Sequence, residues 1–210
     1  MACTVVCVSH TTGSGGHDVG RQVAKELGFL YVDEEIVVKA AAQGGIDATD
    51  VADEESRKTF ARRFLETLAE GGGDAWMLGA PITAAVEMEV LRPAEIRTLI
   101  RETVEQTAAR GNVVIVAHAA SFALEPGTNL LRVFVTASTK TREQRVAAAE
   151  ELDEREAARR IKDSDAGRND YLQRFYSVER ESPTDYDLVV NTDHLSAEQA
   201  AQIVLRAAGR

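Results

Sequence analysis

The sequence predicts an α/β protein built on a single five-stranded parallel sheet. Five short runs rich in β-branched and apolar residues have the length and character of strands buried on both faces. Segments with helical periodicity separate these runs, which is the pattern of a parallel sheet with right-handed crossovers. A cluster of glycines follows the first run. The five runs are Thr4–Val8, Phe29–Val32, Val113–Val116, Leu130–Val135 and Tyr186–Asn191.

The first strand, the glycine cluster and the next helix form a unit suited to binding phosphate. The loop Ser9–Gly16 follows the strand, and apolar residues at three- and four-residue spacing then predict a helix that ends at Gly28. Glycine permits positive φ and leaves no Cβ between backbone N–H groups and an anion. The helix N-terminus adds unpaired N–H donors and partial positive charge. We therefore expect phosphate groups to bind at Gly13, Ser14, Gly15, Gly16, His17 and Asp18.

The composition indicates one acidic domain spanning residues 1–210. The chain has 34 acidic and 24 basic residues, a net charge of −10, which argues against a surface that binds nucleic-acid polymers. No apolar run reaches membrane-spanning length and no leader segment precedes the first strand, so we expect a soluble, cytoplasmic protein without membrane contacts. Cys3 and Cys7 are expected to be buried thiols on the same side of the first strand. The sequence leaves homodimer formation open.

Helices are expected between and after the strands. Residues 34–43 favour a helix, and residues 47–90 carry an apolar stripe but no clear overall period, so we assign them to a helical insert over the sheet. Pro93 begins a helix that runs to Arg110. A last helix covers Leu195–Ala208, with Ser196 as its N-cap candidate.

Two segments resemble the cytidylate-kinase-like group of the P-loop nucleoside monophosphate kinases. They are SHTTGSGGHDVGRQVAKELGFLYVDEEIVVKAA near the front, and KDSDAGRNDYLQRFY with YDLVVNTDHLS near the end. The resemblance implies a P-loop kinase-like three-layer α/β/α fold with strand order 2-3-1-4-5 and a helical lid at about 153–180. It also implies ATP and Mg²⁺ as cofactors and a nucleoside triphosphate and a small acceptor as partners.

The phosphate loop departs from the usual pattern of that group. Gly16 lies where the loop lysine is expected, and His10 replaces the first glycine. His17 and Asp18 lie where the hydroxyl that holds magnesium is expected, so Asp18 is our candidate metal ligand.

By the same resemblance, the helical insert at about 47–90 is expected to bind the acceptor, which should lie near Asp33, Lys39 and His118. Asp33 ends the second strand, where open α/β sheets present side chains to ligands, although it could equally cap the next helix. His118 and Lys39 lie where related enzymes hold the monophosphate with arginines. The sequence lacks the base-recognition pattern of cytidylate kinases, so CMP is not assumed. His10, His17 and His118 are interpreted as polar donors, with a three-histidine metal site as an alternative.

Charged residues of the predicted lid are the candidate catalytic groups. Arg168 and Asp165 lie in the segment that resembles a kinase lid, and Asp165 is expected to orient Arg168. Arg142 and Arg145 follow the fourth strand and should point toward the same crevice. Arginines in these places would neutralise the transferred phosphoryl group. The alternative is a pair of solvated helices joined by surface ion pairs.

The sequence therefore favours an ATP-dependent phosphotransferase that acts on a nucleotide or a small hydroxyl metabolite. The missing loop lysine leaves a second hypothesis open, in which the protein binds and senses nucleotide without transfer. A third hypothesis is a structural or partner-binding protein that only keeps the fold.

Overall fold

The computed structural model describes residues 3–33, 93–117, 119–127 and 129–209. Its centre is a five-stranded sheet in the order β2-β3-β1-β4-β5, in which every neighbouring pair is parallel. The predicted sheet and its strand order are confirmed. The strands are β1 (Val5–His10), β2 (Leu30–Asp33), β3 (Val113–Val116), β4 (Leu130–Thr136) and β5 (Leu188–Asn191).

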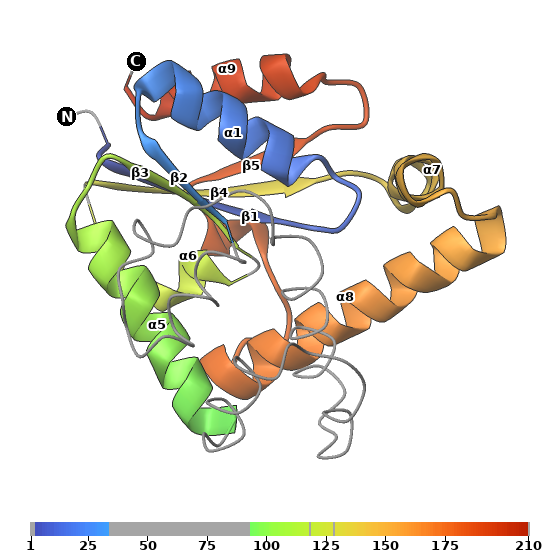
Figure 1. The fold of residues 1–210 in the computed structure, drawn as a ribbon, viewed down its shortest axis with the longest axis horizontal. Coiled ribbons are helices and arrows are strands. Elements are labelled where there is room, and N and C mark those ends of the chain that lie inside the picture. The colour runs from blue at the N-terminus through green and yellow to red at the C-terminus, as the bar shows by residue number, and fades with distance from the viewer. Residues whose placement is uncertain (1–2, 34–92, 118, 128, 210) are drawn as a thin grey trace, which may run out of the picture.

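Helices cover both faces of the sheet, so the molecule has the predicted three layers (Figure 1). Helices α1 and α9 lie on one face, and α5 and α6 lie on the other. Helices α7 and α8 connect β4 to β5. The helices are α1 (Gly16–Leu27), α5 (Pro93–Ala109), α6 (Ala120–Ala123), α7 (Thr139–Glu150), α8 (Glu154–Tyr176) and α9 (Ala197–Ala207).

The central strand β1 is buried along its whole length because both of its faces are covered. Val6 and Val8 pack in the cluster beneath α1 and α9, whereas Cys7 packs in the cluster beneath α5. Burial raises the pKa of the Cys7 thiol to about 12. Cys3 packs against the cluster on the α1 side, so the expectation that both cysteines face the same side is wrong. Strict alternation applies only within a strand, and Cys3 lies two residues before β1 begins.

Strand β1 extends two residues beyond its predicted end, and this extension sets where the glycine loop begins. Ser9 and His10 continue the ladder with β4, where they align with Phe134 and Val135. The loop therefore starts at Thr11, at the carboxyl edge of the sheet. At the other end of the chain, β5 begins later than predicted, and Tyr186 instead stacks on Phe134 with ring centroids 4.9 Å apart.

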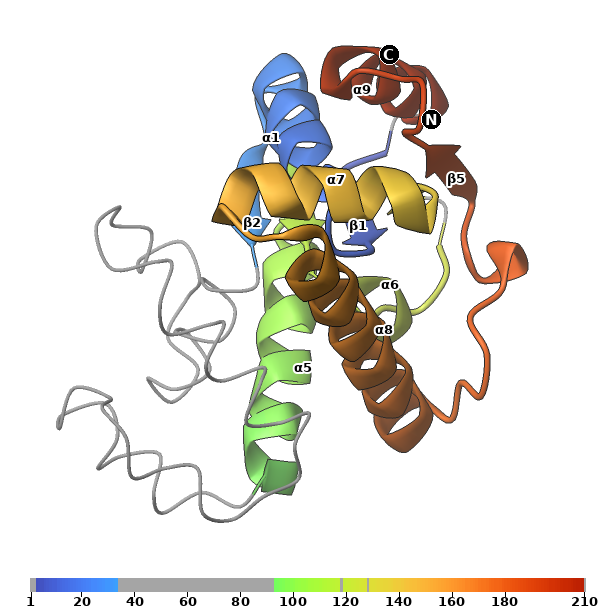
Figure 2. The same cartoon turned by 90° about the vertical axis from the view of Figure 1, so that its right-hand side faces the viewer.

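Helix α7 lies across the carboxyl edge of the sheet, and α8 runs away from it (Figure 2). The two helices pack through a small cluster formed by Val146, Ala157 and Ile161. Helix α8 is one continuous helix through most of the segment that the sequence assigns to a lid, and closure of that segment stays a prediction. The expected helix at 34–43 and the insert at 47–90 lie outside the described residues.

Two helix predictions hold closely. Helix α5 begins at Pro93 as expected, and Ser196 caps α9 by accepting a hydrogen bond from the backbone N–H of Gln199. Within the described ranges, no helix is both long and apolar enough to cross a membrane.

Candidate functional site at the glycine loop

The loop between β1 and α1 turns so tightly that two of its residues must lack a Cβ. A Cβ on Gly16 would lie 2.3 Å from the Cβ of His10, and one on Gly13 would lie 2.8 Å from the carbonyl oxygen of Arg142. Real Cβ atoms do not approach that closely, so both positions require glycine. Gly13 and Gly15 also have φ of 79° and 82°, which glycine adopts without steric cost. The predicted glycine loop is therefore a real close-packed turn that ends where α1 begins.

Every carbonyl oxygen from His10 to Gly15 accepts a hydrogen bond. Two are satisfied from within the unit: the Ser14 N–H and hydroxyl donate to Thr11 O at 3.1 and 2.7 Å, and the Val19 N–H donates to Gly15 O at 3.1 Å. The hydroxyl of the buried Ser14 also lies 3.0 Å from Val135 O, so it faces the sheet. Both donors of Ser14 are thus already engaged within the protein, so Ser14, unlike the other residues predicted to bind phosphate, offers no open donor in this structure.

Side chains from three other elements satisfy the remaining loop carbonyls. Arg168 on α8 donates to His10 O at 3.4 Å, and Arg142 on α7 donates to Thr12 O at 2.7 Å. Arg145 on α7 donates to Gly13 O at 3.4 Å, and Thr192, just after β5, donates to Ser14 O at 2.7 Å. The carbonyl side of the loop is therefore held by residues far apart in the sequence.

The N–H side of the loop has the opposite character. Six backbone N–H groups have no acceptor in the part of the chain that the structure describes; they belong to Thr12, Gly13, Gly15, Gly16, His17 and Asp18. Helices α7, α8 and α9 are each capped by a serine or aspartate side chain, but the N-cap residue of α1 is Gly15, which has none. Open N–H donors at a helix N-terminus form a binding site for anions such as phosphate.

The three predicted arginines meet at this loop, but each is already engaged. Asp165 binds Arg142 through both carboxylate oxygens, at 2.9 and 2.6 Å. Arg168 is buried, pairs with Glu181 and lies over the Phe134 ring at 5.5 Å. The expectation that Asp165 orients Arg168 is therefore wrong. Helical spacing brings the two onto adjacent turns, but it does not show that α7 places Arg142 within reach of the same carboxylate.

Three residues that hold these arginines were not predicted from the sequence. Glu181 binds Arg168 and accepts a hydrogen bond from the hydroxyl of Tyr186, whose pKa is raised by burial and by that bond. Thr192 binds Arg145. A signal for Thr192 existed, because it directly follows the carboxyl end of a parallel strand, β5. Glu181 lies in an irregular segment, where local sequence gives no comparable signal.

Polar residues near β2 form the other side of the site. The rings of His10 and His17 are 4.6 Å apart, and His17 Nδ1 lies 3.0 Å from the Tyr31 hydroxyl. Asp33 is buried at the end of β2, beside Val116 of β3. The acceptor-site candidates Lys39 and His118 lie outside the described residues.

Asp18 lies in the first turn of α1, next to the open N–H groups. Its side chain is 70% exposed and contacts Arg21 at 3.4 Å. Among the residues that the structure describes, no group of three or more His, Cys, Asp or Glu side chains could hold a metal ion.

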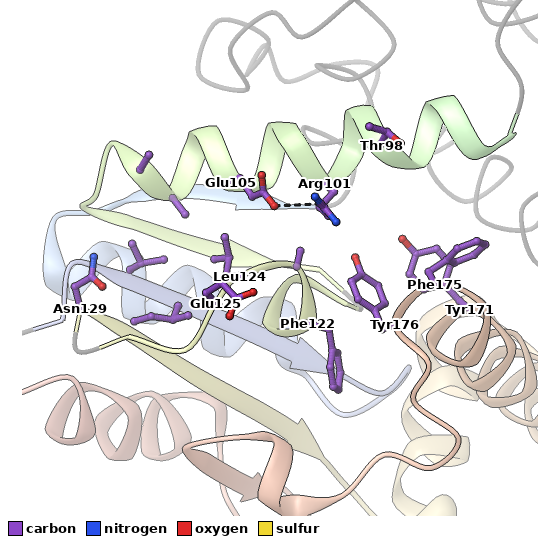
Figure 3. A pocket seen from close by; sticks show the side chains of 15 residues that line it. Thr98, Arg101, Glu105, Phe122, Leu124, Glu125, Asn129, Tyr171, Phe175 and Tyr176 are labelled. Atoms are coloured by element: carbon purple, nitrogen blue, oxygen red, sulfur yellow. Dashed lines mark ion pairs between the residues drawn. The ribbon is translucent and has the colours of Figure 1, made fainter.

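A separate cavity of about 730 Å³ lies on the α5 face of the sheet (Figure 3). It is bordered by α5, by the segment from α6 to β4 and by the end of α8, which contributes Tyr171, Phe175 and Tyr176. The residues that line it include none of the predicted site residues.

A family model and curated relatives match most of the chain. The model of the cytidylate kinase-like family matches residues 5–194. The cytidylate kinase of Ignicoccus hospitalis is 26% identical over 203 residues, covering 97% of this chain and 98% of the relative. That of Roseiflexus castenholzii is 26% identical over 224 residues, covering 97% and 93%.

Solved structures show the same fold at low sequence identity. A protein from Eubacterium ventriosum superposes with a TM-score of 0.64 at 16% identity, covering 98% of both chains. Shikimate kinase from Bacteroides thetaiotaomicron gives a TM-score of 0.53 at 15% identity, covering 99% of both chains. These likenesses identify the fold as an α/β P-loop kinase fold.

Proposed function

Because the chain belongs to the cytidylate kinase-like family, we propose that it is an ATP-dependent phosphotransferase of nucleoside monophosphate kinase type. The acceptor is a nucleotide or a small hydroxyl metabolite. Support for the kinase class comes from the family match and from curated relatives that bear the name cytidylate kinase.

The observation that carries this proposal is the polarity of the glycine loop. All its carbonyls from His10 to Gly15 are engaged by protein donors, whereas six consecutive or nearly consecutive N–H groups have no acceptor among the described residues. A nucleoside triphosphate presents several anionic oxygens in a row and matches such a set of donors. The N–H groups of Gly16, His17 and Asp18 are donors that any helix leaves open at its start, and those of Thr12, Gly13 and Gly15 extend this set into the loop.

Asp18 fits the place of a magnesium ligand. Mg²⁺ usually keeps several waters and is bound by one or two carboxylates together with the substrate phosphates. One exposed carboxylate in the first turn of α1, beside the open N–H groups, is consistent with that requirement. Asp18 would have to exchange its contact with Arg21 for the ion. When bound, Mg²⁺ would neutralise charge on the phosphates.

Catalysis of phosphoryl transfer consists almost entirely of positioning and charge neutralisation. We assign these tasks to Arg142, Arg145 and Arg168, with Asp165 holding Arg142. The acceptor is assigned to the β2 side of the loop, near Asp33, with Lys39 and His118 as further contacts. His17 at the start of α1 contacts Tyr31 of β2, the strand that ends at Asp33, so this contact joins the loop side to the acceptor side of the proposed site.

One observation favours the nucleotide-sensing alternative. Gly16 occupies the place of the usual loop lysine, and its close contact with His10 leaves no room for any side chain there. Removing a preorganised charge donor of this kind costs about 3 to 4 kcal/mol of transition-state stabilisation when nothing replaces it.

A transfer assay separates these functions. The protein is first titrated with ATP, GTP and dATP in the presence of Mg²⁺ by calorimetry, and then assayed for ADP release with a panel of nucleoside monophosphates and small hydroxyl metabolites. Binding with acceptor-dependent ADP release supports the kinase. Binding without release to any acceptor supports nucleotide sensing, and no heat at millimolar nucleotide contradicts both.

A further inference from the structure

The three arginines at the loop differ in whether a carboxylate pairs with their charge. Arg142 is paired with Asp165, and Arg168 is paired with Glu181. Arg145 has no carboxylate partner in the described ranges, and its guanidinium contacts only neutral groups. A triphosphate bound at the loop would therefore meet two neutralised arginines and one whose charge is uncompensated.

Arg145 is held in place by Thr192. Its Nη1 donates to the Thr192 hydroxyl at 2.9 Å, and its Nη2 donates to Thr192 O at 2.7 Å. Thr192 is buried, and its backbone N–H donates to Thr136 O at 2.8 Å, which ties it to the end of β4. The guanidinium of Arg145 thus makes two hydrogen bonds to a single residue, and that residue is itself held by the sheet.

The Thr192 hydroxyl also holds the loop, through a hydrogen bond to the Ser14 carbonyl. A hydroxyl has one proton, so while it accepts from Arg145 it donates that proton, and the nearest acceptor is Ser14 O at 2.7 Å. In a trans peptide the C=O and the following N–H point in opposite directions. Fixing the Ser14 carbonyl on Thr192 therefore fixes the direction of the Gly15 N–H, one of the six open donors.

We propose that Thr192 and Arg145 act as one positioning unit for the nucleotide phosphates. Thr192 aims the Gly15 N–H at the phosphates, and Arg145 supplies from the carbonyl side of the loop the positive charge that the loop lacks at Gly16. The inference rests on the proposed nucleotide binding and adds how this chain compensates for the missing lysine. Both residues act through the loop, so they are positioning residues.

Matched substitutions test the unit. Thr192→Val keeps the shape of the side chain but removes the hydroxyl, whereas Thr192→Ser keeps the hydroxyl. We expect Thr192→Val to weaken Mg-ATP binding by about tenfold, the value of one hydrogen bond to a charged or preorganised group. Thr192→Ser should stay within about threefold of wild type. Arg145→Gln should weaken binding by about tenfold and reduce the dependence of affinity on NaCl concentration, because it removes a charge.

The double variant Thr192→Val, Arg145→Gln distinguishes a unit from two separate effects. We expect it to bind Mg-ATP about as weakly as the more affected single variant, because either change already breaks the chain of contacts. If the two single losses of affinity instead multiply, to roughly a hundredfold in the double variant, Thr192 and Arg145 act separately and the inference is overturned.

Urea unfolding of each variant provides the control for a purely structural role. If Thr192→Val lowers the unfolding free energy but leaves Mg-ATP affinity unchanged, the inference is overturned while the proposed function stands. Equal losses of affinity in Thr192→Val and Thr192→Ser also overturn it. If the folded wild-type protein binds none of the three triphosphates, the proposed function itself fails. Should Thr192→Val not fold, the other two variants still test the inference. It is overturned if Thr192→Ser binds Mg-ATP about tenfold more weakly than wild type, or if Arg145→Gln leaves the salt dependence of affinity unchanged.

Discussion

Asp165 on α8 binds the guanidinium of Arg142 on α7, and Arg142 in turn donates to the carbonyl of Thr12. The side chain of Arg142 is nearly buried, whereas that of Asp165 is 39% exposed. Ser164, the neighbour of Asp165, also binds the Thr12 hydroxyl at 2.6 Å. Helix α8 is thereby connected to the glycine loop at the same residue from two directions, so its first half supports the loop in this structure.

The first prediction concerns this support. Asp165→Asn should lower the unfolding free energy by about 1 to 3 kcal/mol, because a buried guanidinium loses its charged partner. Mg-ATP affinity should fall as well, since the Thr12 carbonyl then lacks a well-placed donor. Asp163→Asn is the matched control, because Asp163 pairs with an exposed arginine on the same helix and should change stability by less than about 1 kcal/mol. Urea unfolding and calorimetry check both; equal effects of the two variants would contradict the assignment.

The second prediction uses two glycines with the same left-handed backbone conformation. Gly15 and Gly28 flank α1, both have positive φ, and a Cβ on either would meet no atom within 4 Å. Gly15→Ala and Gly28→Ala should therefore each lower the unfolding free energy by about 1 to 2 kcal/mol. Only Gly15→Ala should also abolish Mg-ATP binding, because its Cβ would occupy the space in front of the open N–H groups. Similar nucleotide affinity in both variants would place the phosphates elsewhere.

The sequence predicted what depends on local pattern. Continuous β-branched runs revealed β1 and β3 because these two strands are buried along their whole length. The glycine cluster revealed the predicted phosphate loop because close packing at Gly13 and Gly16 excludes any side chain. Family resemblance supplied the strand order. The partners of Arg142, Arg145 and Arg168 depend instead on how α7, α8 and β5 meet in space. Helical spacing therefore suggested the wrong arginine for Asp165 and gave no sign of Glu181.

The third prediction concerns Asp33 as an acceptor contact. Asp33 is buried at the end of β2, beside the end of β3. Asp33→Asn keeps the size of the side chain and the ability to cap a helix, so the variant should remain folded. If Asp33 accepts hydrogen bonds from the acceptor, the KM for acceptor should rise or kcat should fall by about tenfold or more, while ATP affinity changes little. Full activity of a folded Asn variant would remove Asp33 from the site.

The fourth prediction is a pH dependence of stability. Asp187 accepts hydrogen bonds from the guanidinium and from the backbone N–H of Arg132, which lower the pKa of its carboxyl. A lowered folded-state pKa contributes stability that is present above the unfolded value, near 4, and is lost as pH falls through the folded value. Asp187→Asn should therefore flatten the fall in unfolding free energy below about pH 4. Urea unfolding between pH 6 and pH 3 measures this, and an unchanged slope would contradict it.

The last prediction concerns Arg168, the strongest candidate for a group that acts in transfer itself. Its contact with the loop, 3.4 Å from His10 O, is longer than the 2.7 Å contact of Arg142, so nucleotide binding should depend on it less. Its place on α8, the segment that resembles a kinase lid, suits a contact that forms on closure. We therefore expect Arg168→Ala to lower turnover by about a hundredfold or more while Mg-ATP affinity changes by less than about fivefold.

Removing Arg168 alone leaves the mostly buried Glu181 without its charged partner, which could lower stability by up to about 3 kcal/mol and so affect turnover indirectly. The variant is therefore paired with Arg168→Ala, Glu181→Gln, which removes the unpaired charge, and with Glu181→Gln alone. Arg159→Ala is the control for an exposed arginine on the same helix and should keep wild-type turnover. If the double variant is stable and still slow, the loss belongs to the guanidinium. Normal phosphoryl transfer in a folded protein without Arg168 would refute this role, because the reaction would then not need its guanidinium.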